Sequence, residues 1–325
     1  MSRTFTDRRR CALNGPTMGT RWSALFHAPA HFDEITFHAA LAEAVAEVDR
    51  QMSAWKPDSD LNRLNAASPG KWVPVSAAVI KVLSASLAIG KASGGAFDIG
   101  VGDAACAWGF GPTPADPSAI IAAHRPTRTH AYAVVELDPG RDRVRKHEPI
   151  HLDLNGIAKG YGVDRLAETA HAFGLDGALL AINGELRAVG HQPDGAPWAI
   201  AIEVPEPARR APHSVLELTD MAVATSGDYR NWIRFGNRRV GHLIDPERGL
   251  PLPASFSSVS VLAEDCMSAD AWATAMMVLG KDRGTSVAQR FGLSAIFIDP
   301  AKEETAPRTT SPAGRVWRSK AGRKV

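Results

Sequence analysis

The order of helical and strand-like patterns along the 325 residues constrains the fold more than any other feature. Helical patterns or helix start signals occur in four segments, at residues 33–52, 76–92, 156–173 and 268–279. Shorter strand-like segments occur at residues 17–27, 131–137, 143–146, 178–189, 198–204, 214–218, 257–263 and 293–298. Helices and strands are therefore mixed without a regular strand–helix–strand repeat, which favours the α+β class.

Capping residues and glycine-rich stretches mark the boundaries of these elements. Ser59 or Asp60 is suited to start a short helical turn that carries Leu61 and Leu64, and Ser76 is a good N-cap for the second long helix. Three segments are predicted to be irregular: a glycine-rich stretch at 96–114, a turn at 225–228 and a hairpin turn at 236–237.

Composition and charge limit the classes of protein to which this chain can belong. A hydrophobic fraction of 45% and a charged fraction of 22% are ordinary for a globular protein with a sizeable core. The formal net charge of +2 implies no general attraction to nucleic acid. We expect a flexible N-terminus at 1–14, a folded domain at 15–300 made of one unit or two intimate subdomains, and a loose tail at 301–325. That tail is basic, with seven Lys or Arg residues against two Glu.

Cysteine usage and the N-terminal residues favour a reducing compartment. Cys11, Cys106 and Cys266 are odd in number and show neither metal-ligand spacing nor a disulfide framework. No apolar run reaches the ~18 residues of a transmembrane helix. Arginines at 8–10 are not followed by the ~7–15 apolar residues of a signal peptide, so we expect a cytoplasmic protein.

Two segments carry the residues best suited to chemistry. Asp270 and Thr274 stand four residues apart, so a helix would place both on one face. The segment before the third helix offers a carboxylate at Asp153, an accessible backbone at Gly156 and a cation at Lys159. Hard oxygen ligands beside a cation are what a Mg²⁺-assisted reaction on a phosphate needs. The alternatives without a ligand are that Asp153 and Asp270 only stabilise the N-terminus of a helix, and that Thr274 lies on a close-packed helix face.

Other candidate residues stand at the ends of predicted elements. His242 follows a strand and precedes Ile-Asp-Pro, so it is either a general base or a structural histidine. Gly94 and Gly95 precede an aromatic residue and an acid, which is typical of a loop around a planar ligand or simply of a helix stop. Trp55 lies after a helix, where it could stack on a flat ring or cap the core.

These pieces, in this order, resemble the FAD:protein FMN transferase family, also called ApbE-type flavin transferases. The matching blocks are residues 17–20, 52–65, 95–98 with 108–112, 152–164, 224–229, 242–251 and 258–280. Each block alone is weak, but seven in the right order are specific, and together they span about residues 15–300. The resemblance implies an α+β fold with mixed, largely antiparallel sheets and flanking helices.

The resemblance also implies an enzyme that binds FAD, uses Mg²⁺ to activate its pyrophosphate and transfers FMN to a threonine or serine of a target flavoprotein, with AMP released. Carried over by position, the flavin-nucleotide contacts fall on Met18, Trp55, Ala96, Phe97, Asp98, Asp153, Lys159 and Ile244. The metal site falls on Gly156, through its carbonyl, and on Asp270 and Thr274. His242 takes the place of a proposed base that deprotonates the acceptor hydroxyl.

Three positions depart from the family pattern. Asn183-Gly184-Glu185 stands where the family usually has two glycines before an acid, and Ala273 stands where some relatives have a further acid. Many family members are exported and some are lipid-anchored, yet Cys11 follows three arginines without an apolar stretch and is not expected to be a lipidation site. Either this protein acts in the cytoplasm or its true start lies elsewhere.

Two other functions stay open at this point. Water could attack at the same metal site and give FMN and AMP, which would make the protein a hydrolase. A non-catalytic flavin-binding or flavin-delivery protein is the third reading, although such a protein would not need a pair of metal ligands.

Overall fold

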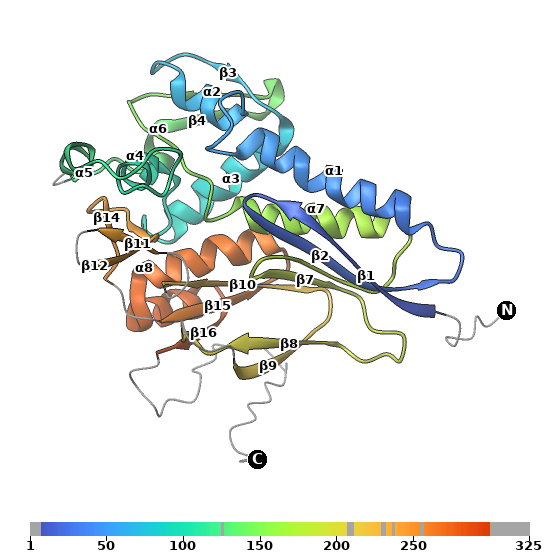
Figure 1. The fold of residues 1–325 in the computed structure, drawn as a ribbon. Coiled ribbons are helices and arrows are strands. Elements are labelled where there is room, and N and C mark those ends of the chain that lie inside the picture. Colours follow the sequence, from blue (N-terminus) through green and yellow to red (C-terminus); the bar gives the residue numbers. More distant parts are fainter. Residues whose placement is uncertain are drawn as a thin grey trace.

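A seven-stranded antiparallel sheet forms the centre of the molecule (Figure 1). The structure, a computed structural model, describes residues 8–124, 127–206, 211–228, 232–235, 238–253 and 257–299. The order across the sheet is β1-β2-β6-β7-β10-β15-β16. The strands are β1 (Arg8–Thr17), β2 (Thr20–Pro29), β6 (Ala178–Ile182), β7 (Glu185–Val189), β10 (Met221–Gly227), β15 (Ser258–Ala263) and β16 (Ser294–Ile298).

Both faces of this sheet are covered, because apolar residues alternate along its central strands. Ala222 and Ala224 of β10 pack with one hydrophobic cluster, whereas Val223 between them packs with another on the opposite face. The long helices α1 (Glu34–Met52), α7 (Ala158–Ala172) and α8 (Cys266–Arg290) lie on the first face (Figure 1). The hairpin of β8 (Trp198–Glu203) and β9 (Pro212–Leu218) packs against the second.

A further set of elements, most of them short apart from the helix α3, lies beyond these three helices. It contains α2 (Asp60–Ala66), β3 (Val73–Pro74), α3 (Ala77–Ala92), η2 (Ile99–Val101), α4 (Gly102–Ala107), α5 (Pro117–Ala123), α6 (Ala131–Val134), β4 (Val135–Asp138), η3 (Pro139–Arg141) and β5 (Arg143–Lys146). Two small hairpins follow β10, namely β11 (Trp232–Phe235) with β12 (Arg238–Gly241) and β13 (Ile244–Asp245) with β14 (Leu250–Pro251). The α+β prediction, with largely antiparallel sheets and flanking helices, is confirmed.

Most predicted helix starts agree with the structure. The carboxylate of Asp33 accepts the backbone N–H groups of Ile35 and Thr36 at the start of α1. The hydroxyls of Ser59 and Ser76 do the same for α2 and α3. Capping residues therefore identified the starts at Ser59 and Ser76, and hydrophobic periodicity identified the helix that begins after Asp33, without any knowledge of tertiary contacts.

Several boundaries differ from the sequence-based expectations. Residues 8–14, expected in a flexible terminus, pair with β2 as part of β1, and residues 1–7 lie outside the described part. The stretch 96–114 is not wholly irregular, because it contains η2 and α4. Residues 131–134 are helical as α6, whereas a strand was expected to begin there. The expected tail at 301–325 lies outside the described residues.

The predicted turn at 225–228 is wrong for its first three residues. Thr225, Ser226 and Gly227 belong to β10 and pair with β15, where the hydroxyl of Thr225 meets that of Ser260 at 2.7 Å. The polar residues at this end of β10 resemble a turn signal. In the folded chain Thr225 instead bonds across the strands, and the hydroxyl of Ser226 meets that of Thr274 on α8. The hairpin across 236–237 is confirmed by the pairing of β11 with β12, although its two turn residues lie outside the described part.

The last long helix extends further than expected. It was predicted at 268–279, yet α8 runs from Cys266 to Arg290 and continues past a non-helical residue, Gly280, with φ of 71°. Glycine tolerates this left-handed φ, so the helix can bend there and continue. No helix among the described residues combines the length and apolar character needed to cross a bilayer.

Helices α7 and α8 contact one another closely because α7 carries a glycine at the crossing. The carboxylate of Asp164 on α7 accepts the backbone N–H groups of Cys266 and Met267, both at 2.9 Å, and so holds the start of α8. A Cβ at Gly160 would collide with the carbonyl oxygen of Cys266 and lie 2.8 Å from Cβ of Asp270. Only a residue without a side chain fits this contact.

We predict that Gly160→Ala lowers the free energy of unfolding by about 1–3 kcal/mol, because the added methyl group must push α7 and α8 apart. Urea unfolding monitored by circular dichroism measures the change. Gly140→Ala is the matched control, since a Cβ there meets no atom closer than 3.8 Å, and its effect should stay within about 0.5 kcal/mol. Equal effects of the two substitutions would contradict the close-contact interpretation.

Candidate active site

A cavity of about 1120 Å³ lies where the long helices, the sheet and the shorter elements meet. Its walls come from the β1–β2 turn, the end of α1, the segment around Phe97, the start of α7, the ends of β7 and β10, the loop before β13, and α8. All twelve residues proposed from the sequence line it: Met18, Trp55, Ala96, Phe97, Asp98, Asp153, Gly156, Lys159, His242, Ile244, Asp270 and Thr274. Residues spread over more than 250 positions of the chain therefore share one surface.

The three proposed metal ligands lie near one another. A Cβ on Gly156 would lie 3.2 Å from Oγ1 of Thr274, so the backbone of this glycine approaches the helix that carries the hydroxyl. One carboxylate oxygen of Asp270, on the same helix, accepts the backbone N–H of Gly160 at 3.0 Å. The Thr274 hydroxyl also meets the hydroxyl of Ser226 at 3.2 Å. Hydrogen bonds thus hold both side chains at the cavity wall.

The donor set fits Mg²⁺ bound together with a phosphate. The described residues contain no group of three or more His, Cys, Asp or Glu side chains suited to hold a metal ion. Gly156, Asp270 and Thr274 instead offer a carbonyl, one carboxylate and one hydroxyl, all hard oxygen donors. Mg²⁺ commonly takes one or two carboxylates and completes its shell with water and substrate phosphates. The residues present therefore fit such a shared site rather than a closed protein cage.

Lys159 forms an ion pair that the sequence analysis did not predict. Its ammonium contacts Oε1 of Glu185, the first residue of β7, which is only 3% exposed. Oε2 of the same carboxylate is buried without a hydrogen-bond partner. The sequence contained a signal for Glu185, because an acid that directly follows the Asn183-Gly184 turn begins a strand at a position facing the interior.

Burial and neighbouring charges shift the pKa values of this group. Burial raises the pKa of Asp270 to about 7, while Lys159 lowers it and Glu185 raises it. Burial alone lowers the pKa of Lys159, but the charges of Glu185 and Asp270 outweigh that effect and raise it. The ammonium of Lys159 is therefore charged at neutral pH, and a positive charge at the cavity would favour an ionised Asp270.

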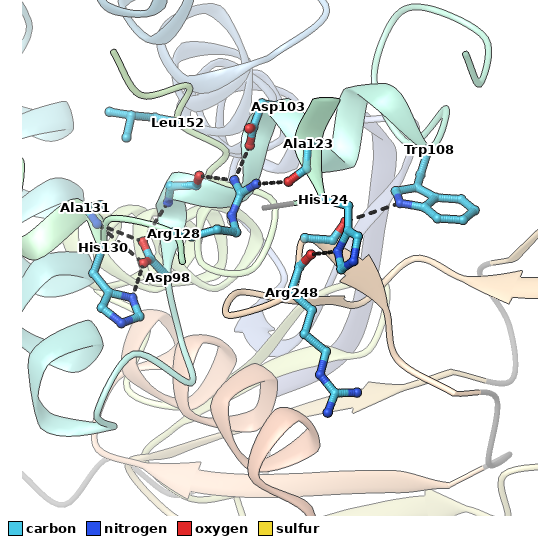
Figure 2. Close-up of polar contacts among 12 residues, drawn as sticks. Asp98, Asp103, Trp108, Ala123, His124, Arg128, His130, Ala131, Leu152 and Arg248 are labelled. Carbon is cyan, nitrogen blue, oxygen red and sulfur yellow. Dashed lines mark hydrogen bonds and ion pairs between the residues drawn. The ribbon is translucent and has the colours of Figure 1, made fainter. Parts of the chain in front are cut away.

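The carboxylate of Asp98 is used to hold its own loop (Figure 2). It accepts hydrogen bonds from the backbone N–H groups of Gly100, at 2.7 Å, and Ala131, at 3.1 Å, and meets Nδ1 of His130 at 2.7 Å. The side chain is 5% exposed. The carboxylate of Asp98 therefore joins its own segment to residues 130–131, and its proposed contact with the nucleotide stays a prediction.

Asp153 is held in the turn that leads to Gly156. Its carboxylate accepts the backbone N–H of Asn155 at 2.6 Å and the side-chain amide of the same residue at 3.1 Å. Burial raises the pKa of Asp153, and the bonds from Asn155 oppose that shift. The Asp153 backbone N–H donates to the carbonyl of Ile99 at 2.7 Å, which ties this turn to the segment carrying Phe97.

Two residues at the rim offer surfaces for a planar ligand. The side chain of Trp55 is 61% exposed, unusual for a tryptophan, and lies between α1 and α2. Met18 occupies the turn between β1 and β2 with a positive φ of 43°, a left-handed conformation that few non-glycine residues adopt. Phe97 is buried beside Gly156. An isoalloxazine ring could contact any of these apolar surfaces.

The loop with His242 is tied to the opposite wall by bonds to the following turn (Figure 2). Nε1 of Trp108 donates to the carbonyl of Gly249 at 3.3 Å, and Nδ1 of His124 meets the carbonyl of Arg248 at 2.9 Å. The ring of His242 itself lies edge-on to Phe110, with centroids 6.4 Å apart. These contacts set the position of the candidate base relative to the segment 96–110.

Arg128 connects several segments of the same wall through its guanidinium (Figure 2). Its guanidinium donates to the carboxylate of Asp103, to the carbonyl of Ala123 at 2.7 Å and to that of Gly100 at 3.2 Å. The side chain is only 9% exposed. Arg128 was not predicted from the sequence, since nothing local distinguishes it from a surface arginine.

We predict that Asp98→Asn lowers the free energy of unfolding by about 1–3 kcal/mol. A neutral amide replaces the charged acceptor of the Gly100 and Ala131 N–H groups, and His130 must then accept at Nδ1 instead of donating there. Thermal or urea unfolding measures the change. Asp58→Asn, at an exposed position, is the control and should change the free energy by less than about 0.5 kcal/mol. A stable Asp98→Asn variant that has lost only ligand affinity would instead assign the carboxylate to the ligand.

Comparisons with known proteins show which family and fold the chain resembles. The ApbE family matches residues 18–297. The FAD:protein FMN transferases of Vibrio cholerae and Klebsiella pneumoniae are each 35% identical to the chain, over 289 and 295 residues. These alignments cover 88% of this chain in both cases, and 86% and 83% of the respective relatives. The solved structure of the flavin transferase ApbE from Vibrio cholerae superposes with a TM-score of 0.80 at 31% identity, covering 93% of this chain and 97% of the other.

Proposed function

Because this chain belongs to the ApbE family, we propose that it transfers the FMN part of FAD to a threonine or serine hydroxyl of an acceptor flavoprotein, with AMP as the second product. The resemblance drawn from the sequence is confirmed at the level of the family. The observation that best supports this function is the single cavity lined by all twelve proposed residues. Its volume of about 1120 Å³ lies at the upper end of small-molecule sites, which suits a dinucleotide.

The transfer exchanges one phosphorus–oxygen bond for another. The acceptor hydroxyl oxygen forms a bond to the phosphorus on the riboflavin side of the diphosphate. The bond from that phosphorus to the bridging oxygen breaks, and the bridging oxygen leaves with AMP. The hydroxyl proton goes to His242, which stands half-buried at the cavity.

The residues of this chain position the reactants and supply charge, and none of them forms a covalent intermediate. A divalent cation, when bound, neutralises negative charge on the diphosphate and on the departing phosphate. Gly156, Asp270 and Thr274 are the residues that would hold it. Lys159 provides a charged ammonium at the same wall, and Trp55, Met18 and Phe97 provide apolar surface for the flavin.

The experiment that tests the function uses the whole protein with FAD, Mg²⁺ and a candidate acceptor domain. After denaturing electrophoresis, flavin fluorescence on the acceptor band is the expected result. Free FMN with an unlabelled acceptor would assign the chain as an FAD hydrolase. Bound but unchanged FAD would assign it as a flavin-binding protein. Omission of the metal by chelation should prevent transfer.

We predict that Asp270→Ala reduces transfer at modest Mg²⁺ by about a hundredfold or more, because the only carboxylate in the proposed ligand set is removed. The rate of acceptor labelling measures the loss. Asp282→Ala, at an exposed position of the same helix, is the control and should label the acceptor at the wild-type rate. Wild-type labelling by Asp270→Ala would remove the metal assignment.

We predict that His242→Ala slows transfer by about 10²–10⁴-fold, the usual contribution of a general base, while the Kd for FAD changes by less than roughly threefold. Labelling kinetics and FAD binding are measured on the same preparation. His171→Ala, at an exposed position outside the cavity lining, serves as the control. Parallel losses of rate and affinity would make His242 a structural residue of the loop.

A further inference from the structure

The cavity is more negative than a binding site for a diphosphate should be. Among the described residues that line it, six are carboxylates and two are lysines: Asp49, Asp98, Asp153, Glu185, Glu203 and Asp270 against Lys56 and Lys159. Both lysines are in ion pairs, Lys56 with Asp49 at 2.5 Å and Lys159 with Glu185. Each lysine in the cavity wall is therefore already paired with a carboxylate, which reduces the positive charge that it presents to a dinucleotide.

Glu185 lies at the centre of this arrangement. Its side chain is 4% exposed, Oε1 contacts the ammonium of Lys159, and Oε2 is buried without a hydrogen-bond partner. A buried carboxylate with one oxygen unsatisfied carries a large desolvation penalty unless a nearby positive charge balances it. A single lysine cannot balance both Glu185 and the neighbouring Asp270, so the three groups together carry one net negative charge when Asp270 is ionised.

A divalent cation would reverse that balance. Held by Asp270 and Thr274, it would change the net charge of the group from minus one to plus one. The Glu185 carboxylate would then be attracted to the cation as well as to Lys159. Its attraction to Lys159 would weaken, and the ammonium could turn toward an anionic phosphate. Such an exchange of partners makes the affinity for the nucleotide depend on the cation.

We propose that Glu185 is a positioning residue that makes FAD binding depend on the divalent cation, because it holds and neutralises Lys159 until the cation is present. This inference rests on the proposed function only in taking FAD and a divalent cation as the ligands. Glu185 acts through Lys159 and needs no contact with FAD.

The test compares the Kd of FAD in excess EDTA with its Kd in Mg²⁺, for the wild type and Glu185→Gln in the same buffer at one fixed pH. Stopped-flow flavin fluorescence records binding in the first seconds, before turnover. The ratio of the two constants is the coupling factor, and typical couplings are about 5–150-fold. We expect Glu185→Gln to bind FAD more tightly than the wild type in EDTA and to lower the coupling factor by roughly tenfold.

A second measurement needs no nucleotide. Binding of Mn²⁺ alone, followed by electron paramagnetic resonance, should weaken by about 10–100-fold in Glu185→Gln, as for loss of an outer partner of a metal site. Glu185→Asp, which retains the charge, should restore much of the affinity. Glu217→Gln, which removes an exposed carboxylate of β9 outside the cavity lining, should bind Mn²⁺ like the wild type.

Two results would overturn the proposal. Equal weakening of FAD binding with and without Mg²⁺ would mean that Glu185 only supports the shape of the wall. Unchanged constants in both conditions would mean that the ion pair has no influence on the ligands. Melting temperatures confirm that each variant is folded. Acceptor labelling is measured separately. If the wild type binds FAD in a Mg²⁺-dependent way but labels no acceptor, the transferase function is refuted and the role proposed for Glu185 still holds.

Discussion

The contact between α7 and α8 at Gly160 is the feature on which the cavity depends. It brings the backbone of α7 close enough for its Gly160 N–H to donate to the carboxylate of Asp270, while Asp164 holds the first turn of α8 in return. Lys159 stands next to that glycine, and Thr274 stands one turn beyond Asp270. The spacing of these two helices therefore sets the distance between the candidate metal ligands and the ammonium.

Local signals predicted much of the fold. Helix starts at Ser59 and Ser76 could be identified because each side chain caps its own helix, and the helix after Asp33 because its apolar residues recur at helical spacing. The prediction was wrong where tertiary contacts decide the outcome. Residues 8–14 form a strand only because β2 is beside them, and the hydroxyl-rich end of β10 resembles a turn until β15 pairs with it.

The candidate site was predicted largely through the resemblance to a family, and the structure places every one of those residues at one cavity. What the sequence did not provide was the partner of each side chain. Glu185, Arg128 and His130 lie 26, 25 and 32 positions from the residues that they contact. No periodic pattern or spacing rule connects such pairs, so the ion pair at Lys159 and the internal role of Asp98 became visible only in three dimensions.

The ties between the loop of His242 and the opposite wall have a consequence for how the site opens. The bonds from Trp108 to Gly249 and from His124 to Arg248 join positions 141 and 124 residues apart. These ties are single hydrogen bonds between short segments, whereas the strands of the sheet are joined by continuous ladders. The wall that carries His242 can therefore separate from the segment 108–124 at a lower free energy than the sheet unfolds, so the site can open while most secondary structure persists.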